Sequence, residues 1–297
     1  MQAELTTKKP IWLRVSPPGG EIYTKVKASL RSRELHTVCE EARCPNLSEC
    51  WGSGTATIMI MGDICTRGCR FCAINGGKPV SLDGNEPGRV AEAIREWGLN
   101  YVVITSVCRD DLKDGGANHM ASTIRAIKSR CPFTTVEVLI PDFKGNIDSL
   151  RMIIESGPKV LSHNIETIRR LTARVRDPRA SYEQSLSLLK KCKQINCEIY
   201  TKSSIMLGLG ESEAETIEAM RDLRSVGVDI LTMGQYLQPT ARHFPVFEYI
   251  RPERFEKLRE IAKNMGFLHV ASGPLVRSSY RAGDFFAQKI IPKPTCV

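Results

Sequence analysis

The 297-residue chain has no apolar run of membrane-spanning length, and its first residues lack the apolar stretch of a signal peptide. We therefore expect a cytoplasmic, reducing location and no membrane as a partner. In such a compartment the eleven cysteines are better read as metal ligands or catalytic thiols than as disulfides. Internal repeats and low-complexity tracts are also absent, so the length is best accommodated by one large α/β domain with a well-buried core.

The sequence also lacks a block of like charge. Lysine and arginine total 42 against 33 aspartate and glutamate, which gives a net charge of +9 spread along the chain. This excess favours an acidic partner. Charge alone does not distinguish among three explanations, which are binding to nucleic acid, binding to an acidic carrier protein, and solubility.

From residue 55 onward, β-rich runs alternate with amphipathic helical segments, which predicts a parallel sheet covered by helices. No G-x-G-x-x-G follows the first run, and no G-x-x-x-x-G-K-[ST] occurs anywhere, which argues against a doubly wound nucleotide-binding fold. We therefore expect a partial (β/α)6 barrel with its site at the carboxyl ends of the strands. The expected strands are residues 55–61, 101–107, 134–140, 159–166, 198–207 and 229–237.

Directly after the first expected strand, Cys65, Cys69 and Cys72 form a C-x3-C-x2-C pattern in "CTRGCRFC". Three thiolates on one short loop can bind three irons of a [4Fe–4S] cube and leave the fourth iron open to a small molecule. A structural zinc site needs four ligands, and no second C-x2-C is present to complete one. The alternatives are a zinc loop completed by a distant histidine, or simply buried thiols.

A second triplet, Cys39, Cys44 and Cys50, lies nearer the N-terminus with C-x4-C-x5-C spacing. This differs from the C-x4-C-x2-C spacing of plant-type ferredoxins, although it can again hold three corners of a cube. Zinc is the alternative if His36 joins the three thiolates. The polar surroundings, including Pro45, disfavour three ordinary core cysteines.

The C-x3-C-x-aromatic-C loop resembles that of the radical S-adenosylmethionine (SAM) superfamily. With "ELHTVCEEARCPNLSECW", "VLIPDFKG", "HNIET", "KSSIMLGLGE", "GQYLQPT" and "SGPLVRSSYRAG", the chain from Glu34 to Gly283 is similar to the lipoyl synthase family. The resemblance implies two [4Fe–4S] clusters, one of which binds SAM at its open iron. It also implies radical insertion of two sulfur atoms at carbons 6 and 8 of an octanoyl chain, with two SAM molecules used per lipoyl group.

The same resemblance implies the partners and the division of the chain. The substrate would be an octanoylated lipoyl carrier protein or domain, with a reducing electron donor and an iron–sulfur assembly or repair system, and no nucleic acid. Residues 1–54 would be an extension that carries the auxiliary cluster, which is consumed as sulfur donor. Residues 55–272 would form the radical SAM partial barrel. Residues 273–297 would close the auxiliary site with their R-S-S-Y motif.

In this family the fourth ligand of the auxiliary cluster is the second serine of that motif, which corresponds to Ser279. Hydroxyl oxygen is a poorer match for cluster iron than thiolate is. We hypothesise that an iron held in this way is released when its sulfide enters a C–S bond. Without the resemblance, Ser279 would be read as an ordinary hydroxyl in a polar turn. Arg277 is a candidate for the cluster environment or for holding a carboxylate.

Polar residues at the expected strand ends are candidates for binding SAM. They are Thr105, Ser106, Asn164, Glu166 and Lys202. Each could instead be only a strand-end hydrogen-bond former. Cys108 departs from the family, which usually has aspartate there, so the role of that position is in doubt.

Two other readings remain. The first is a different sulfur-inserting radical SAM enzyme. The second is a non-enzymatic, basic iron–sulfur or zinc protein that binds nucleic acid, for which RNA binding should weaken with salt.

Overall fold

A computed structural model describes residues 9–15, 19–41, 44–52, 55–286 and 293–295. Its main sheet has the order β1-β2-β5-β6-β7-β8-β9-β10, and every pairing is parallel except that of β1 with β2. The strands of this sheet are β1 (His36–Thr37), β2 (Thr55–Ile60), β5 (Tyr101–Ser106), β6 (Thr135–Leu139), β7 (Val160–Ser162), β8 (Tyr200–Leu207), β9 (Ile230–Gln235) and β10 (His269–Gly273).

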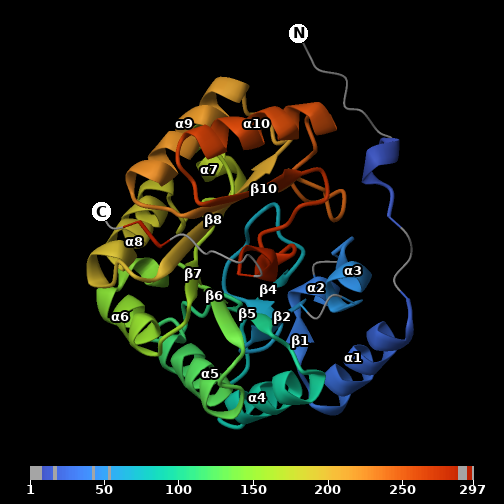
Figure 1. Cartoon of the computed structure of the whole chain (residues 1–297), viewed down its shortest axis with the longest axis vertical. Helices are drawn as coiled ribbons and strands as arrows, with labels where there is room; N and C mark the ends of the chain where they lie inside the picture. Colours follow the sequence, from blue (N-terminus) through green and yellow to red (C-terminus); the bar gives the residue numbers. More distant parts are fainter. Residues whose placement is uncertain (1–8, 16–18, 42–43, 53–54, 287–292, 296–297) are drawn as a thin grey trace.

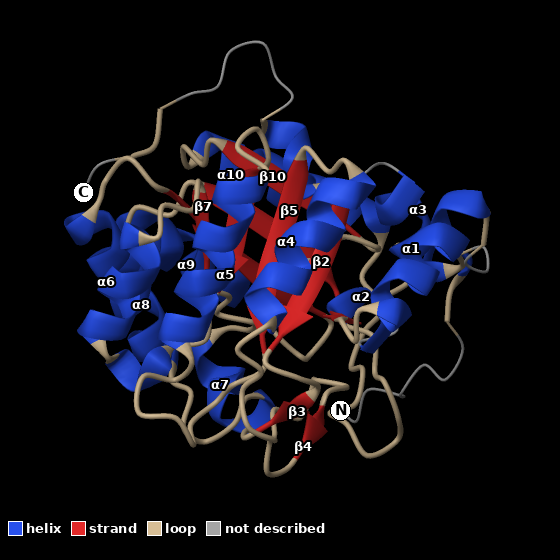
Figure 2. Cartoon of the chain, turned by 90° about the horizontal axis from the view of Figure 1, so that it is seen from below, coloured by secondary structure: helices blue, strands red, loops and turns tan. Residues whose placement is uncertain are grey.

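Helices cover the outer face of this curved sheet (Figure 1). In chain order they are α4 (Glu86–Trp97), α5 (Ala117–Arg130), α6 (Ile147–Glu155), α8 (Tyr182–Ile195), α9 (Glu213–Ser225) and α10 (Pro252–Asn264). The short helix α7 (Arg169–Val175) instead lies at the carboxyl ends of the strands (Figure 2). Three more helices precede β2 in the chain and lie at one side of the sheet: α1 (Glu21–Ser32), α2 (Val38–Glu41) and α3 (Leu47–Gly52). Within the described ranges, no helix is both long enough and apolar enough to cross a membrane.

The expected α/β partial barrel is confirmed, and all six expected strands are present within a few residues of their expected bounds. The sheet is larger than expected, because β10 adds a further parallel strand beside β9 and β1 adds an antiparallel one beside β2. Both have weak sequence signals. β1 has only two residues, and β10 reads "HVASG", in which a single β-branched residue stands among small and polar ones.

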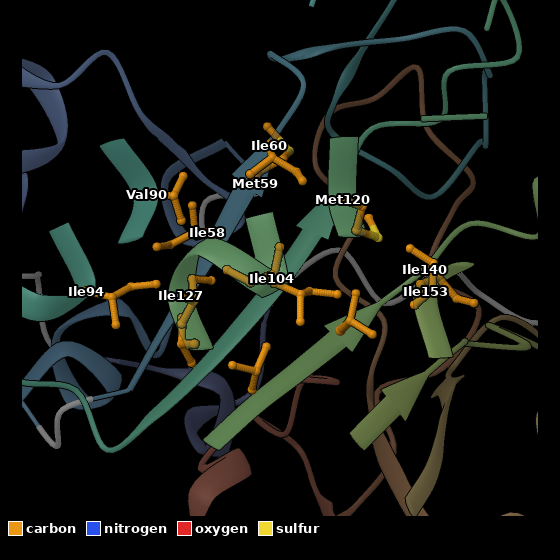
Figure 3. Close-up of a cluster of buried hydrophobic side chains, with 14 of the residues drawn as sticks. Ile58, Met59, Ile60, Val90, Ile94, Ile104, Met120, Ile127, Ile140 and Ile153 are labelled. Atoms are coloured by element: carbon orange, nitrogen blue, oxygen red, sulfur yellow. The ribbon is translucent and has the colours of Figure 1, made fainter. Parts of the chain in front are cut away.

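The largest apolar cluster lies between the sheet and its helices (Figure 3). Ile58 and Ile60 of β2 and Ile104 of β5 are fully buried, as are Val90 and Ile94 on one face of α4. Strands buried on both faces read as continuous apolar runs, which is why "TATIMI" and "YVVITS" identify these strands so clearly. This core fixes where the strands end, and therefore where the loops that follow them lie.

Several helices start at side-chain caps, which fixes the loops that connect them to the strands. Ser212 and Glu215 form a reciprocal capping box at the start of α9. Asn146 accepts hydrogen bonds from the first turn of α6, and Ser181 does so at α8. The caps of α6 and α9 follow strand ends, and that of α8 follows α7, so all three constrain the connections at the rim of the barrel.

The two ends of the barrel differ. Beyond the carboxyl ends of β2 and β5, a small sheet of β3 (Ile64–Cys65) and β4 (Asn75–Gly76) carries the cysteine loop (Figure 2). At the amino ends of the strands, the short helix η3 (Ala282–Phe285) packs against β5. There Phe285 makes an edge contact with Tyr200, with ring centroids 5.4 Å apart. The C-terminal segment therefore runs from one end of the barrel to the other.

Candidate functional site

The cysteine loop is held to the barrel by one buried arginine. The guanidinium of Arg67 donates to both oxygens of Asp142 at 2.7 Å, and its Nε donates to Asp110 at 2.8 Å. Asp110 follows β5 and Asp142 follows β6. Burial lowers the pKa of Arg67, but the hydrogen bonds to the two carboxylates outweigh burial and leave the pKa raised. Arg67 therefore stays charged and fixes the loop across two strand ends.

A second anchor reaches the loop from the far side of the barrel. Asp177, which follows α7, accepts a hydrogen bond from Gly68 N at 2.8 Å, and its own backbone N donates to Cys69 Sγ at 3.3 Å. Hydrogen bonds donated by Arg179 are the main cause that lowers the pKa of Asp177. We did not anticipate Arg67, Asp177 or Arg179 from the sequence, because an isolated arginine or aspartate in a loop has no periodic or spacing signal.

The three thiols of this loop lie close enough to interact electrostatically. Burial, with smaller contributions from Cys69 and Cys65, raises the pKa of Cys72 to about 12. Burial also raises the pKa of Cys69. Cys65 differs, because a hydrogen bond from Cys108 is the main cause that lowers its pKa to about 6, while burial opposes the shift. Buried thiols with raised pKa values need a cationic partner in order to ionise, and cluster iron provides one.

Within the described residues, no group of three or more His, Cys, Asp or Glu side chains is placed to hold a single metal ion. Each cysteine of a cube binds a different iron, so a cube does not require three side chains around a single ion. In addition, Cys65, Cys69 and Cys72 all accept backbone N–H hydrogen bonds, from Arg67, Asp177 and Ile74 respectively. Such bonds stabilise thiolates bound to iron.

The strand-end residues next to this loop leave polar atoms without partners. Ser106 Oγ and Asn164 Oδ1 are buried and have no hydrogen-bond partner among the described residues. Asn164 Nδ2 donates to Glu166 Oε1 at 3.2 Å, and burial raises the pKa of Glu166. Thr105 differs, because its hydroxyl already donates to the Leu139 carbonyl at 3.0 Å. Buried polar atoms normally have partners, so these orphans indicate a polar ligand at this edge.

Glu166 has a backbone φ of 67°, a left-handed conformation that is unusual for a residue other than glycine. Its backbone is held there by hydrogen bonds to β8, from Glu166 N to Ser204 O and from Met206 N to Glu166 O. Strain that neighbouring structure imposes in this way is often found at ligand sites. Glu166 also raises the pKa values of Cys69 and Cys72 electrostatically, so it lies near the cysteine loop.

The expectation that Lys202 lies at the carboxyl end of its strand is wrong. It is the third residue of the eight-residue strand β8, and its ammonium group is 2.9 Å from the buried carboxylate of Glu137 on β6. Tyr101 donates to the same carboxylate at 2.6 Å. The side chains of Lys202 and Glu137 are both almost fully buried, which makes Lys202 half of an internal ion pair nearer the amino ends of the strands. The strand ends at Leu207, as the expected bounds 198–207 have it, so Lys202 is an interior residue of the expected strand as well as of the observed one.

The N-terminal triplet lies beside the first strands of the sheet. Burial raises the pKa of Cys39 to about 12, with smaller contributions from Cys44 and Cys50, which shows that the three sulfurs are near one another. Burial likewise raises the pKa of Cys50 to about 11. His36, the candidate fourth zinc ligand, has its Nδ1 3.5 Å from Glu41 Oε1.

The C-terminal segment packs against this triplet. Asn46 Nδ2 donates to the Leu275 carbonyl at 2.6 Å, and Tyr280 donates its hydroxyl proton to Glu49 at 2.9 Å. The backbone N–H of Arg281 hydrogen-bonds to the Cys50 sulfur. Ser279 lies between these contacts in the chain and is half-buried. Segments more than 220 residues apart in the sequence therefore form one site.

Arg277 stands beside the same triplet. Its Nη1 donates to the carbonyl oxygens of Gln235 at 3.1 Å and Val276 at 2.9 Å. Burial lowers its pKa, while the nearby Cys44 opposes that shift. The backbone leaves little space here, because a Cβ on Gly234 would lie 1.9 Å from the Val276 carbonyl oxygen. Among the described residues, the printed hydrogen-bond acceptors of this guanidinium are all carbonyl groups, which suits a negatively charged neighbour.

The partial barrel, its cysteine loop and the orphaned polar atoms beside that loop define a radical SAM enzyme. Residues 59–223 match the model of the radical SAM superfamily, and residues 2–44 match the model described as the N-terminal domain of lipoyl synthase of that family. The X-ray structure of the [FeFe]-hydrogenase maturase from Carboxydothermus hydrogenoformans shares the fold. Its TM-score is 0.56 at 14% identity, over 88% of this chain and 76% of that one.

Two relatives specify the family. The lipoyl synthase of Anaeromyxobacter dehalogenans is 55% identical over 98% of this chain and 99% of its own length. The apicoplast lipoyl synthase of Plasmodium knowlesi is 54% identical over 97% of this chain, which spans 65% of that relative's length. The chain belongs to the lipoyl synthase family. Membership implies SAM and two [4Fe–4S] clusters, and the two groups of buried or half-buried thiols fit such clusters.

Proposed function

We propose that this protein inserts two sulfur atoms at carbons 6 and 8 of an octanoyl chain carried on a lysine of a lipoyl carrier protein or domain. The observation that best supports this proposal is the contact between the C-terminal segment and the N-terminal triplet. The Asn46–Leu275 and Glu49–Tyr280 hydrogen bonds bring the R-S-S-Y segment to the cysteines. A site of this composition would be unnecessary for SAM cleavage alone.

At the barrel site, Cys65, Cys69 and Cys72 would hold the first cluster. When bound, that cluster with SAM supplies a one-electron cleavage that yields an organic radical able to remove hydrogen from unactivated carbon. The chain's own residues position the cofactor and exclude water. Arg67 and Asp177 fix the loop, while Ser106, Asn164 and Glu166 offer hydrogen-bonding groups to the polar parts of SAM.

Asn164 and Glu166 are the best candidates for binding the ribose. Their side chains are linked to each other, and a carboxylate accepts from a pair of vicinal hydroxyls while the adjacent amide presents its unpartnered oxygen. Thr105 can accept one further hydrogen bond through its hydroxyl oxygen. Lys202 is excluded from this set because it is paired with Glu137 within the barrel.

At the auxiliary site, Cys39, Cys44, Cys50 and Ser279 would hold the second cluster, which acts as the substrate that gives up sulfur. The oxygen of Ser279 is the ligand from which iron would be released most readily. Arg277 would balance the negative charge of the cluster from its half-buried position near Cys44. We expect Ser279→Cys to assemble the cluster and to suppress sulfur insertion; undiminished lipoyl product would contradict this role.

The remaining partners follow from the reaction. Each hydrogen abstraction consumes one electron, so an external reducing donor is needed. A consumed cluster also requires an iron–sulfur assembly or repair system for further turnovers. The net charge of +9 suits an acidic carrier surface. We place the protein in a reducing compartment such as the cytoplasm, because the thiols proposed as cluster ligands must remain reduced.

Anaerobic reconstitution followed by turnover with SAM, a reductant and an octanoyl-lysine peptide tests the proposal. We expect about eight irons per chain, as two cubes require, together with 5′-deoxyadenosine and a product whose mass has increased by two sulfurs. A Cys39→Ala variant should still cleave SAM but give no thiolated product. If the parent protein binds only about four irons, or cleaves SAM without forming thiolated product, the two-cluster proposal is wrong.

A further inference from the structure

Two exposed arginines meet over one buried aromatic ring beside the cysteine loop. Arg70 belongs to that loop, and Arg174 lies near the end of α7, which is joined to the loop by a backbone hydrogen bond of 2.8 Å from Arg70 N to the Val175 carbonyl. The Cζ atoms of Arg70 and Arg174 are 5.3 and 5.8 Å from the centre of the Phe244 ring. Arg70 Nη1 also donates to the Arg174 carbonyl at 3.4 Å. Two positive charges are therefore held side by side at the carboxyl ends of the strands, where Figure 2 shows α7.

The loop that follows β9 brings a third arginine and an exposed aromatic ring to the same place. His243 Nε2 lies 2.9 Å from the Cys72 carbonyl oxygen, so this loop packs directly on the cysteine loop. Arg242, the residue before it, is exposed. Phe247 is 38% exposed and stacks on Phe244, with ring centroids 5.7 Å apart. We refer to these exposed side chains as the rim patch: Arg70, Arg174, Arg242 and Phe247.

No guanidinium group of the rim patch forms an ion pair with a carboxylate in the part of the chain that the structure describes. The contrast within α7 is clear, because its other two exposed arginines are paired. Arg169 lies 3.1 Å from Asp222, and Arg170 lies 2.6 Å from Glu215. Neighbouring like charges without a counter-charge repel one another, so the rim patch favours a negatively charged partner.

We propose that the rim patch is the surface on which an acidic face of the octanoylated carrier protein docks; this inference rests on the proposed function. Arginine and aromatic side chains are enriched at protein interfaces, and a guanidinium group can bind a carboxylate through two hydrogen bonds. The patch adjoins the loop that carries Cys69 and Cys72. A carrier seated there presents its octanoyl-lysine arm to the mouth of the barrel.

The shape of the patch favours a protein over a nucleic acid. Three arginines surround one pair of stacked rings, whereas a nucleic-acid backbone is followed by a longer groove or stripe of positive charge. Glu248, the residue after Phe247, is exposed and adds a negative charge beside the patch. Carboxylates that are spaced on a folded protein surface can match such a compact arrangement.

The surface is tested by the binding of an octanoylated lipoyl domain with net negative charge to the reconstituted full chain. Fluorescence anisotropy gives the affinity at two salt concentrations, and turnover of an octanoyl-lysine peptide is measured in parallel. The test variant is Arg174→Gln/Arg242→Gln, which leaves the cysteine loop unchanged. The matched control is Lys190→Gln/Arg221→Gln, which removes two exposed positive charges from α8 and α9 on the outer face.

We expect the test variant to bind the domain about tenfold more weakly than the parent, with a smaller effect of salt, because two exposed charge contacts are lost. The control should bind as the parent does. Both variants should thiolate the short peptide at the parent rate, because the peptide does not reach the patch.

Equal affinity of the parent and the test variant for the domain would overturn the docking surface, even if the peptide is thiolated and the proposed reaction stands. Arginine-dependent binding of the domain without thiolation of the peptide would support the surface and show that the proposed reaction is wrong. If the arginines instead support binding of a single-stranded RNA and not of the domain, the patch is a nucleic-acid surface and the proposal is wrong.

Discussion

Asn46 Nδ2 lies 2.6 Å from the carbonyl oxygen of Leu275, although 229 positions separate the two residues in the chain. Asn46 stands between the second and third cysteines of the N-terminal triplet, and Leu275 lies two residues before the first residue of the R-S-S-Y motif. The Asn46 side chain is buried, so this bond joins the two parts of the auxiliary site inside the protein. Ser279, the proposed fourth ligand of that site, depends on such contacts for its position because its own segment is otherwise a loop.

Asn46→Ala should weaken the auxiliary site and leave the barrel site intact. Loss of the donor leaves a carbonyl group unsatisfied at a cost of about 1–3 kcal/mol. We expect part of the reconstituted iron to be lost faster to a chelator, while SAM cleavage continues. The control is Asn196→Ala, which removes an asparagine whose side chain accepts only a local hydrogen bond from Glu198 N. Equal iron retention in both variants would show that the Asn46 contact does not support the site.

Arg67→Met should be far more damaging than the loss of an exposed arginine. It leaves Asp110 and Asp142 without their main cation, and breaking a buried ion pair from one side costs about 3–5 kcal/mol. We expect both lower stability in denaturant and poor loading of the barrel cluster. Arg170→Gln, which breaks an exposed pair with Glu215, should cost less than about 1 kcal/mol. Comparable losses of stability in the two variants would contradict the anchoring role of Arg67.

The strand–helix alternation and both cysteine triplets could be predicted from the sequence because their signals are local. "YVVITS" is an apolar run of strand length, and the spacing of Cys65, Cys69 and Cys72 places three thiols on one loop. The short strand β10 was missed because "HVASG" has too little apolar character to stand out. Local patterns therefore predicted the framework and the positions of the six thiols.

Features that depend on contacts between distant segments could not be predicted. Nothing near Lys202 indicates that its partner is Glu137, which lies 65 residues earlier on another strand. The anchoring of the cysteine loop by Arg67, Asp142 and Asp177 likewise requires the closed curvature of the sheet. Ser279 is proposed as a ligand by resemblance alone, since a serine in a polar turn has no distinguishing pattern. These side chains acquire their roles only when the barrel brings the strand ends together.

Lys202→Met should lower stability without weakening SAM binding. The carboxylate of Glu137 would remain buried with only the Tyr101 hydroxyl as partner, at a cost of about 3–5 kcal/mol. The double variant Lys202→Met/Glu137→Leu removes both charges and should recover most of that loss. We would measure urea unfolding, and SAM affinity by calorimetry. A marked loss of SAM affinity in the folded double variant would instead return Lys202 to the cofactor site.

The stability of the protein should fall below neutral pH in part because of His163. This imidazole is buried between the Ile140 carbonyl and the Ser185 hydroxyl, at 2.9 and 3.0 Å. Burial first, and then the positive charge of Arg176, lowers its pKa from 6.5 to about 4, while Asp142 opposes the shift. Between these two values the unfolded chain binds more protons than the folded one, so acid favours unfolding.

The contribution of His163 is fully present above pH 6.5 and is lost as the pH falls toward about 4. At pH 5 the protonation of His163 in the unfolded chain should lower the free energy of unfolding by about 2 kcal/mol relative to pH 7. We expect the His163→Gln variant to lose less stability than the parent over this interval, by about that amount, as measured by urea unfolding at each pH. An identical pH dependence in parent and variant would mean that other groups, such as the Arg67 carboxylate partners, account for the whole acid sensitivity.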